Sequence, residues 1–505
     1  MTTTCLTKQK EKPDPPAVPS QCNRSSKWEW FGTDGLRGPV NTHPITPQCM
    51  RMLGQALARL IQAGNVNALR PTNTKPHVVI GWDTRASSPQ LATALSEGIC
   101  SHGIHVVFLG VLPTAAVSQL VQSQGACAGL VVSASHNPAS DNGVKILDNQ
   151  GYKLCQQLEK QLQSQLQTLE DFPTTPSNIA SCSWKPDAAH IYMQRIKTCM
   201  TSALPLKGLR IAIDCAQGAA YKVGPLLLQQ LGAQIFVLAD QPNGHNINQC
   251  SGSEYPQKLQ QFVNTCPVDF AVALDGDADR CAFVDEKGTV LPGDAVLMLL
   301  ATDLKSQNRL TNNTLVATVM SDMALQQQLQ SADIAVQHTP VGDRHVVQRL
   351  REQGFSLGGE PSGHIVFWPH SNTADGLLAT LFMASLLQRS GKPLSDLARR
   401  FQPTPRTLLS VPVPCKVSLP QLPKTQQLIK QIQKTLGRNG RIFVRYSGTE
   451  PKGRILLEGP DLSHIQQLAK QVARSWQQEL LQDTKPPAAK QGTRLAANAK
   501  HELEL

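Results

Sequence analysis

Short runs of apolar residues recur along this chain, and stretches of helical length separate one run from the next. The runs fall at residues 77–82, 104–110, 129–134, 209–214, 234–240, 270–275, 314–320 and 333–339. Strands that are apolar throughout, without a polar alternation, are typical of parallel sheets covered by helices on both faces. The pattern therefore predicts α/β domains.

Two proline-containing stretches interrupt this pattern, at residues 171–187 and 401–407. After the second stretch, apolar strands at 441–445 and 454–459 flank a polar loop. A segment at 461–482 then repeats apolar residues at helical spacing. We therefore expect an α/β protein with three similar α/β domains on mostly parallel mixed sheets, plus a smaller C-terminal α+β domain.

These interruptions also suggest where the domains begin and end. We expect four domains, at residues 28–185, 186–291, 292–401 and 402–482. Residues 1–27 and 483–505 contain few apolar residues to bury, which predicts a disordered leader and a disordered tail.

The chain carries a net charge of +11, and the position of this charge along the sequence bears on the kind of molecule the protein binds. Nearly half of the excess lies in the two terminal segments, and aromatic residues make up only 5% of the chain. This argues against a nucleic-acid surface, whereas a modest positive bias suits a small anionic ligand. No apolar run approaches the roughly 20 residues of a membrane span. Thirteen cysteines without a CxxC pair favour reduced thiols, and with no signal-peptide pattern we expect a cytoplasmic protein.

The segment VALDGDADRC places three aspartates directly after an apolar strand. Asp275, Asp277 and Asp279 are separated only by Gly276 and Ala278. Carboxylates this close repel one another unless a cation lies among them, and Mg²⁺ prefers oxygen ligands. A solvated acidic turn is the alternative.

The segment SASHNP, at 133–138, ends another apolar strand with a polar turn. Ser135 could be a helix N-cap, but His136, Asn137 and Pro138 exceed what a cap requires. The GxSxG pattern of esterases is absent, so acyl transfer is not supported. Phosphoryl transfer fits better, because a magnesium loop elsewhere in the chain could meet a phosphorylated serine.

A third polar cluster lies in SLGGEPSGHIVF, which we read as the end of a strand. Glu360, Ser362 and His364 alternate, so we expect them to face one side, where they could bind sugar hydroxyls and transfer a proton. The alternative for His364 is a structural histidine.

The fourth cluster is VRYSGTEPKGR. Arg445, Ser447, Gly448 and Thr449 combine donors with a glycine that permits close backbone approach, which is the composition of an anion-binding loop. An ordinary hairpin turn is the alternative.

Together with FGTDGLRG at 31–38, these segments resemble the α-D-phosphohexomutase superfamily, and within it the branch of the bacterial phosphoglucosamine mutases. The motifs are SASHNP at 133–138, DGDADR at 275–280, GGEPSGH at 358–364 and RYSGTEP at 445–451. The similarity spans residues 29 to 480. Pro361 and Ala278 depart from the residues expected at these motif positions, and Pro361 bears on the choice of sugar.

The resemblance implies four domains around a central cleft, which carry in turn a phosphoserine loop, a metal loop, a sugar-binding loop and a phosphate-binding loop. It implies that Ser135 is the phosphoserine. One Mg²⁺ would be held by Asp275, Asp277 and Asp279 together with the phosphate on Ser135. Lys145 and His364 would be the general acid/base partners. The resemblance further implies that Arg37 is a catalytic residue and that it steadies the phosphoserine with His136, Asn137 and Arg280. The sugar-binding residues would be Glu360 and Ser362. The phosphate-binding residues would be Arg445, Ser447, Gly448 and Thr449.

The implied reaction interconverts glucosamine 6-phosphate and glucosamine 1-phosphate through a 1,6-bisphosphate, which also acts as primer. It would supply UDP-N-acetylglucosamine and cell-envelope synthesis, from a cytoplasmic monomer or homodimer whose partner is a small sugar phosphate. Two alternatives stay open: a phosphomannomutase/phosphoglucomutase acting on neutral hexose phosphates, and a non-catalytic sugar-phosphate-binding protein.

Overall fold

A computed structural model describes residues 30–31, 35–64, 66–70, 75–168, 180–200, 206–446 and 452–483. The leader predicted at 1–27 lies outside the described residues. The predicted tail does so too, except for Asp483, which ends the last helix. Within the described part of the chain, no helix combines the length and the apolar character that crossing a membrane requires.

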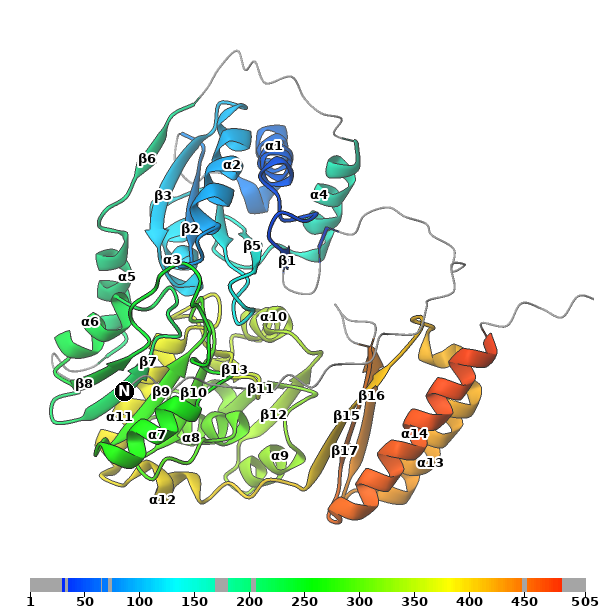
Figure 1. Cartoon of the computed structure of the whole chain (residues 1–505). Helices are drawn as coiled ribbons and strands as arrows, with labels where there is room; N and C mark the ends of the chain where they lie inside the picture. The colour runs from blue at the N-terminus through cyan, green and yellow to red at the C-terminus, as the bar shows by residue number, and fades with distance from the viewer. Residues whose placement is uncertain are drawn as a thin grey trace, which may run out of the picture.

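Domain I is built on a six-stranded mixed sheet, which lies at the top of Figure 1. Its strands, in spatial order, are β1 (Leu36–Pro39), β5 (Asp141–Leu147), β4 (Ala128–Val132), β2 (His77–Trp82), β3 (His105–Val111) and β6 (Cys182–Trp184). Strands β4, β2, β3 and β6 are parallel, while β5 runs antiparallel to both β4 and β1.

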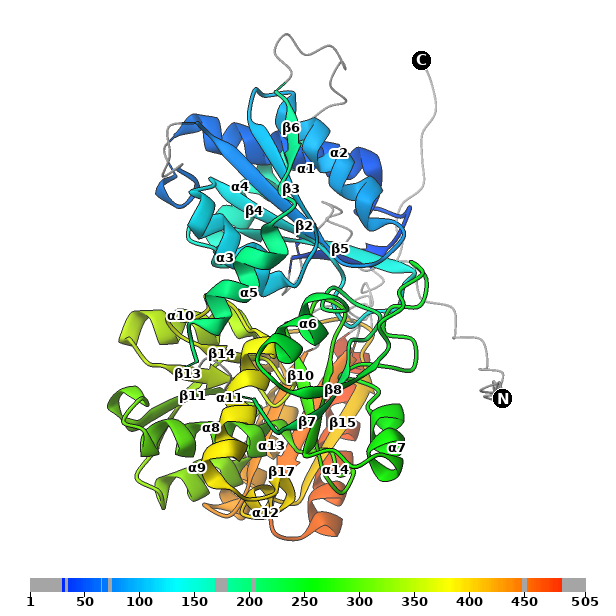
Figure 2. The same cartoon turned by 90° about the vertical axis from the view of Figure 1, so that its left-hand side faces the viewer.

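Helices cover both faces of this sheet, as its fully apolar strands require. Val78 and Ile80 pack with α1 (Pro47–Ala63), α2 (Ser88–Cys100) and α4 (Gln156–Thr168). Val79 packs on the other face with α3 (Thr114–Gln124) and α5 (Ala188–Lys197). In Figure 2, α5 joins the upper domain to the lower ones. A short 3-10 helix, η1 (Asn67–Leu69), follows α1.

Domain II has a four-stranded sheet in the order β10-β9-β7-β8. Strands β7 (Arg210–Asp214), β8 (Gln234–Leu238) and β9 (Phe270–Leu274) are parallel, and β10 (Cys281–Asp285) returns antiparallel to β9. Its helices are α6 (Val223–Gln230) and α7 (Gln257–Thr265).

Domain III repeats this arrangement in the order β12-β11-β13-β14. Strands β11 (Thr314–Thr318), β12 (Ala335–Thr339) and β13 (Leu357–Gly359) are parallel, and β14 (Ile365–Phe367) is antiparallel to β13. Its helices are α8 (Gly293–Ser306), η2 (Thr311–Asn313), α9 (Met323–Gln330), α10 (Asp343–Gln353), α11 (Gly376–Ser390) and α12 (Leu394–Ala398).

Domain IV is the smaller α+β unit, drawn in orange and red in Figure 1. Strands β15 (Arg406–Pro412), β17 (Lys452–Glu458) and β16 (Arg441–Tyr446) form an antiparallel sheet. Helices α13 (Pro423–Leu436) and α14 (Leu462–Asp483) pack on it around Trp476, after the short η3 (Leu419–Gln421). The predicted fold class, three similar α/β domains and a smaller C-terminal domain, is confirmed.

One unit recurs in domains I, II and III: a buried strand, a polar turn and an antiparallel return strand. The pairs are β4–β5, β9–β10 and β13–β14. Three of the four polar clusters identified in the sequence lie in these three turns. An isolated bridge between Arg280 and His364 joins the turns of domains II and III directly.

Candidate active site

The turns of domains I and II bring Ser135 to the aspartates. The hydroxyl of Ser135 donates to Oδ2 of Asp275 at 2.6 Å, although 140 positions separate the two residues. Both residues are buried. The serine and the aspartate turn therefore form a single polar site between two domains.

The turn after β4 holds Ser135 in an unusual backbone conformation. Its φ is 52°, in the left-handed region that residues other than glycine rarely adopt. The hydroxyl of Ser133 accepts from the Ser135 amide at 2.9 Å, and Nδ1 of His136 lies 3.3 Å from the Ser135 hydroxyl. This conformation directs the Ser135 side chain out of the strand and toward domain II.

The three aspartates form a group that could hold a metal ion. One ligand oxygen from each lies within 4.8 Å of the others, and all three residues are buried. Burial, followed by repulsion from Asp279 and Asp277, raises the pKa of Asp275 to about 7. Oδ1 of Asp277 is buried without a hydrogen-bond partner among the described residues. An orphaned buried oxygen beside two more carboxylates fits a hard divalent cation.

Lys145 reaches the aspartates from β5, where it lies opposite Val131 of β4. Its ammonium nitrogen is 2.5 Å from an oxygen of Asp277 and 2.5 Å from an oxygen of Asp279. The hydroxyl of Thr114 also donates to Asp277. The ammonium is thus buried but paired, in direct contact with two of the carboxylates.

The third turn carries Glu360, Ser362 and His364 between β13 and β14. His364 Nδ1 lies 3.0 Å from Glu360 and 3.4 Å from the hydroxyl of Ser362, and its Nε2 lies 3.1 Å from Asp279. These residues follow the end of β13 as expected, but they do not alternate along a strand: the turn folds back, with Glu360 N donating to His364 O at 2.9 Å. The three side chains meet nonetheless.

Electrostatics tie this turn to the aspartates. Burial alone would lower the pKa of His364, but the attraction by Asp279 and the hydrogen bonds to Asp279 and Glu360 together outweigh it and raise the pKa to about 10. Burial would likewise raise the pKa of Glu360, yet its contact with His364 holds that pKa below the ordinary value. Together these shifts favour an imidazolium between two carboxylates.

Arginines complete the surroundings of the site. Arg280 donates from its amide to Asp275 at 3.1 Å and from Nη1 to Glu254 at 2.9 Å, and its Nε lies 3.2 Å from Nε2 of His364. Burial, together with the charges of Arg280 and of Arg37 in β1, lowers the pKa of His136 to about 3. Positive charges therefore surround the turn at 133–138, called the serine turn below, where they would stabilise an anion bound at Ser135.

Only part of the predicted phosphate-binding loop can be placed. Arg445 lies in β16, where burial and the nearby Arg454 lower its pKa. Ser447, Gly448 and Thr449 lie outside the described residues. The charge of Glu360 acts on Arg445 in the opposite direction, which links domain IV electrostatically to the turn of domain III.

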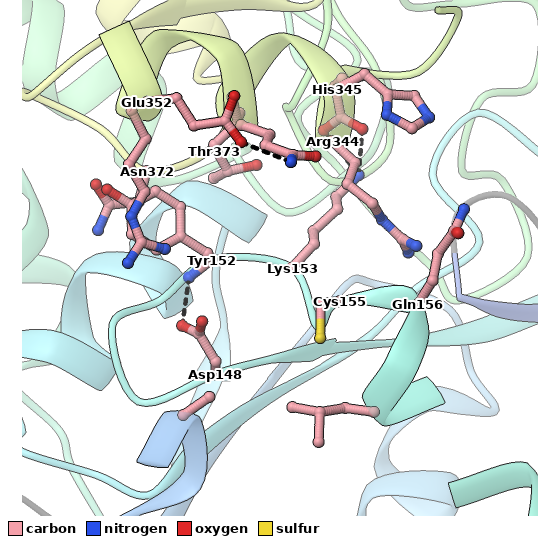
Figure 3. A pocket seen from close by; sticks show the side chains of 16 residues that line it. Asp148, Tyr152, Lys153, Cys155, Gln156, Arg344, His345, Glu352, Asn372 and Thr373 are labelled. Atoms are coloured by element: carbon pink, nitrogen blue, oxygen red, sulfur yellow. Dashed lines mark hydrogen bonds and ion pairs between the residues drawn. The ribbon is translucent and has the colours of Figure 1, made fainter. Parts of the chain in front are cut away.

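A cavity of about 680 Å³ lies between domains I and III. Figure 3 shows Asp148, Tyr152 and Lys153 on one wall and Arg344 and His345 of α10 on the other. Lys153 crosses between the domains to Asp343 at 2.8 Å. None of the predicted site residues is among the residues that line the cavity.

Two residues that contact the turn carrying Ser135, Arg85 and Asn248, were not predicted from the sequence. Both donate to the carbonyl oxygens of Ser135 and Asn137. For Arg85 a signal existed, because DTR follows the predicted strand at 77–82 directly. For Asn248 no comparable signal exists, since it lies in a loop well after β8.

Comparisons with known proteins find a family match in each of the four domains. Four family profiles match in order: "Phosphoglucomutase/phosphomannomutase, alpha/beta/alpha domain I" at residues 29–172, domain II at 190–288, domain III at 292–404 and the C-terminal domain at 408–475.

Curated relatives are similar over nearly the full chain. A phosphoglucosamine mutase of Myxococcus xanthus is 41% identical over 460 residues, which is 90% of this chain and 98% of the relative. One of Bdellovibrio bacteriovorus is 39% identical over 456 residues, covering 90% of this chain and 99% of the relative.

Solved structures share the fold at lower identity. A phosphoglucomutase/phosphomannomutase family protein of Burkholderia thailandensis superposes with a TM-score of 0.73 at 22% identity, covering 89% of this chain and 97% of that one. The N-acetylphosphoglucosamine mutase of Aspergillus fumigatus gives a TM-score of 0.60 at 18% identity, covering 91% and 98%.

Proposed function

This chain belongs to the phosphoglucomutase/phosphomannomutase family of the α-D-phosphohexomutase superfamily, and from that premise we propose that it interconverts glucosamine 6-phosphate and glucosamine 1-phosphate. It is an isomerase that transfers a phosphoryl group within a sugar phosphate. Curated relatives about 40% identical over most of the chain are named phosphoglucosamine mutases, which supports the amino sugar as substrate.

A single contact carries the proposal: the hydroxyl of Ser135 at 2.6 Å from Asp275, in front of three buried carboxylates. A serine in this position can carry a phosphoryl group whose charge a bound cation would balance. A helix cap or an ordinary turn would not need the aspartates of another domain.

The proposed reaction has two phosphoryl transfers. In the first, phosphorylated Ser135 donates its phosphoryl group: the bond from phosphorus to Ser135 Oγ breaks, a bond to a sugar hydroxyl forms, and the hydroxyl loses its proton to the enzyme. The sugar is now a 1,6-bisphosphate and turns around in the cleft. In the second transfer, its other phosphoryl group returns to Ser135 Oγ, and the freed sugar oxygen takes up a proton.

Lys145 and His364 are the proposed general acid/base partners. Both contact Asp279, at 2.5 and 3.1 Å, so they approach the reacting region from domains I and III. Arg37 and Arg280, with His136 and Asn137, are proposed to steady the phosphoserine. Positioning and electrostatics then supply most of the rate enhancement, as expected of phosphoryl transfer.

Asp275, Asp277 and Asp279 would hold one Mg²⁺ with an oxygen of the Ser135 phosphate. The ion, when bound, supplies positive charge that balances the transferring phosphoryl group. The unpartnered Oδ1 of Asp277 supports this assignment.

Glu360 and Ser362 are proposed to bind the sugar, and Arg445 with Ser447, Gly448 and Thr449 to bind the phosphate that does not react. A mutase needs both a reactive and a passive phosphate site, since its intermediate carries a phosphate at each end. We further propose a cytoplasmic monomer or homodimer that is primed by glucosamine 1,6-bisphosphate or a similar bisphosphate.

The test measures turnover of glucosamine 6-phosphate, glucose 1-phosphate and mannose 1-phosphate side by side, with Mg²⁺ and a bisphosphate primer. We expect the amino sugar to be preferred and Ser135→Ala to be inactive on all three. Preference for a neutral sugar would identify the chain as a phosphomannomutase/phosphoglucomutase. The observation in favour of that alternative is Pro361, which lies in the turn at 360–364 proposed to bind the sugar. Absence of turnover, with no phosphate on the intact protein, would point to a non-catalytic binding protein.

A further inference from the structure

Two buried side chains from different domains hold the backbone of the serine turn. We propose that Arg85 and Asn248 are positioning residues that fix this turn and so aim Ser135 at the aspartates. The inference rests on the proposed function of Ser135 as the phosphoryl carrier.

The contacts form a closed set of four hydrogen bonds. Nη2 of Arg85 donates to the carbonyl oxygens of Ser135 and Asn137, at 3.2 and 2.6 Å. Nδ2 of Asn248 donates to the same two oxygens, at 2.8 and 2.9 Å. A carbonyl oxygen has two lone pairs, so each can accept both bonds. We call this set the carbonyl clamp.

Each donor of the carbonyl clamp is itself fixed. The Arg85 side chain is fully buried against Asp83, and Asp83 also accepts from the Arg85 amide at 3.0 Å and from the hydroxyl of Ser88 at 2.9 Å. Asn248 is buried, and its amide donates to Ala216 O at 2.9 Å. A guanidinium taken out of water beside its counter-ion, with Nη1 and Nη2 both hydrogen-bonded, has little freedom to move.

The Ser135 backbone needs this support. Its φ of 52° is costly for a residue with a side chain and persists only where the surroundings determine it. The carbonyl clamp acts on the carbonyl of Ser135 itself and on that of Asn137, two positions later. Without it, the turn could relax and carry the hydroxyl away from Asp275.

The two donors also come from opposite sides of the domain boundary. Arg85 follows β2 in domain I, whereas Asn248 lies between β8 and α7 in domain II. The aspartate turn passes close by, since a Cβ added at Gly276 would lie 2.5 Å from the Ser135 carbonyl oxygen. The carbonyl clamp therefore fixes the position of Ser135, in domain I, relative to the carboxylates of domain II.

This geometry predicts a loss in kcat and not in substrate binding. A misplacement of about 1 Å at the reacting atoms can cost about 100-fold in rate. No hydrogen bond joins Arg85 or Asn248 to the sugar turn at 360–364 within the described residues. KM for the sugar phosphate should therefore change little.

The test uses Asn248→Ala, with Asn149→Ala as the matched control. Asn149 is equally buried and also donates from Nδ2 to two backbone carbonyls, Asn67 O at 3.0 Å and Arg70 O at 2.8 Å, away from the serine turn. We expect Asn248→Ala to lower kcat by about 10- to 100-fold with KM within about twofold, and to speed amide exchange in the peptide covering 133–139. Asn149→Ala should do neither, and Arg85→Lys should lose less kcat than Arg85→Ala.

Should Asn248→Ala fail to fold, Asn248→Asp keeps the side-chain shape and removes the donated hydrogen bonds. Wild-type kcat in a folded variant at position 248, or equal losses in the variants at 149 and 248, would overturn the inference. Failure of the proposed function is separate, because the wild-type enzyme would then turn over no sugar phosphate. In that case the exchange measurement still decides whether the carbonyl clamp fixes the turn, since unchanged exchange in the variant at 248 would refute it.

Discussion

Asp277 shows how a single side chain in this site serves two partners at once. One carboxylate oxygen accepts from Lys145 and Thr114, while the other is buried without a partner among the described residues. The second oxygen is therefore the one available to a metal ion.

We predict that Asp277→Asn lowers Mg²⁺ affinity by at least about tenfold, since even indirect support of a metal site is worth 10- to 100-fold. Mutase activity should fall in parallel, and EDTA should abolish it in the wild-type enzyme. Isothermal titration with Mg²⁺ measures the affinity. Asp333→Asn, at a side chain that is 95% exposed, serves as control. Unchanged Mg²⁺ affinity in the variant at 277 would exclude this carboxylate as a ligand.

Glu360 offers a second residue-scale prediction. Its carboxylate accepts from the amide of Gly342 at 2.9 Å and contacts His364 at 3.0 Å. Glu360→Gln keeps the shape but loses the charge, and a hydrogen bond to a charged group contributes about 1.5–3 kcal/mol. We expect KM for the sugar phosphate to rise about tenfold or more, measured by steady-state kinetics. A change confined to kcat would show that Glu360 acts through His364 and not on the sugar.

Single residues differed in how far the sequence could predict them. Ser135 and the three aspartates follow apolar strands directly, so the ends of predicted strands located them. Asn248 does not, and its contact with Ser135 depends on how domains I and II meet. Such contacts between domains leave no periodic signal in the sequence.

At the scale of elements, the apolar strands were predicted within one or two residues, but the return strands were not. Strand β5 begins with the polar residues Asp141 and Asn142, and β14 has only three residues, Ile365–Phe367. Short or polar-ended strands carry too little apolar pattern for recognition. The prediction that Glu360, Ser362 and His364 follow the end of a strand is confirmed by β13, but their alternation along a strand is not, because the chain turns back at Gly363, whose φ is +93°.

Helix α11 gives an element-scale prediction about pH. Asp375 caps its N-terminus, where it accepts from the amides of Leu377 and Leu378 and from the hydroxyl of Tyr192. Burial raises its pKa from 3.8 to about 6. Because the folded-state pKa is raised, the stability this carboxyl contributes is present at low pH and is lost as pH rises through about 6.

Asp375→Asn should remove this loss. An amide can still accept from the helix and can donate to Tyr192, so we expect the variant to gain stability relative to wild type between pH 4.5 and pH 7.5. The gain is on the order of 3 kcal/mol at most, from the shift of 3.8 to about 6. Urea denaturation at the two pH values measures it. An equal stability difference at both values would contradict the prediction.

At the scale of the whole molecule, domains I, II and III share one continuous apolar cluster, to which domain IV contributes none of its described residues. Residues of α3, α5, α6, α8 and α11 belong to one cluster, and those of α13, α14 and β17 to another. The sequence indicated the separate C-terminal domain through its different pattern. It could not indicate how that domain attaches, since the attachment depends on a few polar side chains.

Arg441 and Glu458 provide part of that attachment. Arg441, in β16, pairs with the fully buried Glu458 of β17 at 2.7 Å and donates to the carbonyl of Ser321 in domain III. Glu458 in turn accepts from the amide of Met323, at the start of α9, at 3.2 Å. Two strands of domain IV are thereby tied to one helix end of domain III.

Because Arg445 lies on the same strand as Arg441, the orientation of β16 also determines where the proposed phosphate-binding loop faces the cleft. Arg441→Ala leaves Glu458 buried without its ion-pair partner, which weakens this attachment. We predict a rise of about tenfold in KM for the sugar phosphate, equivalent to about 1.4 kcal/mol, with an increased radius of gyration by small-angle X-ray scattering. Arg438→Ala, at an exposed position that follows α13, should change neither quantity. If Arg441→Ala kept the wild-type KM and radius, domain IV would have to be held by other contacts.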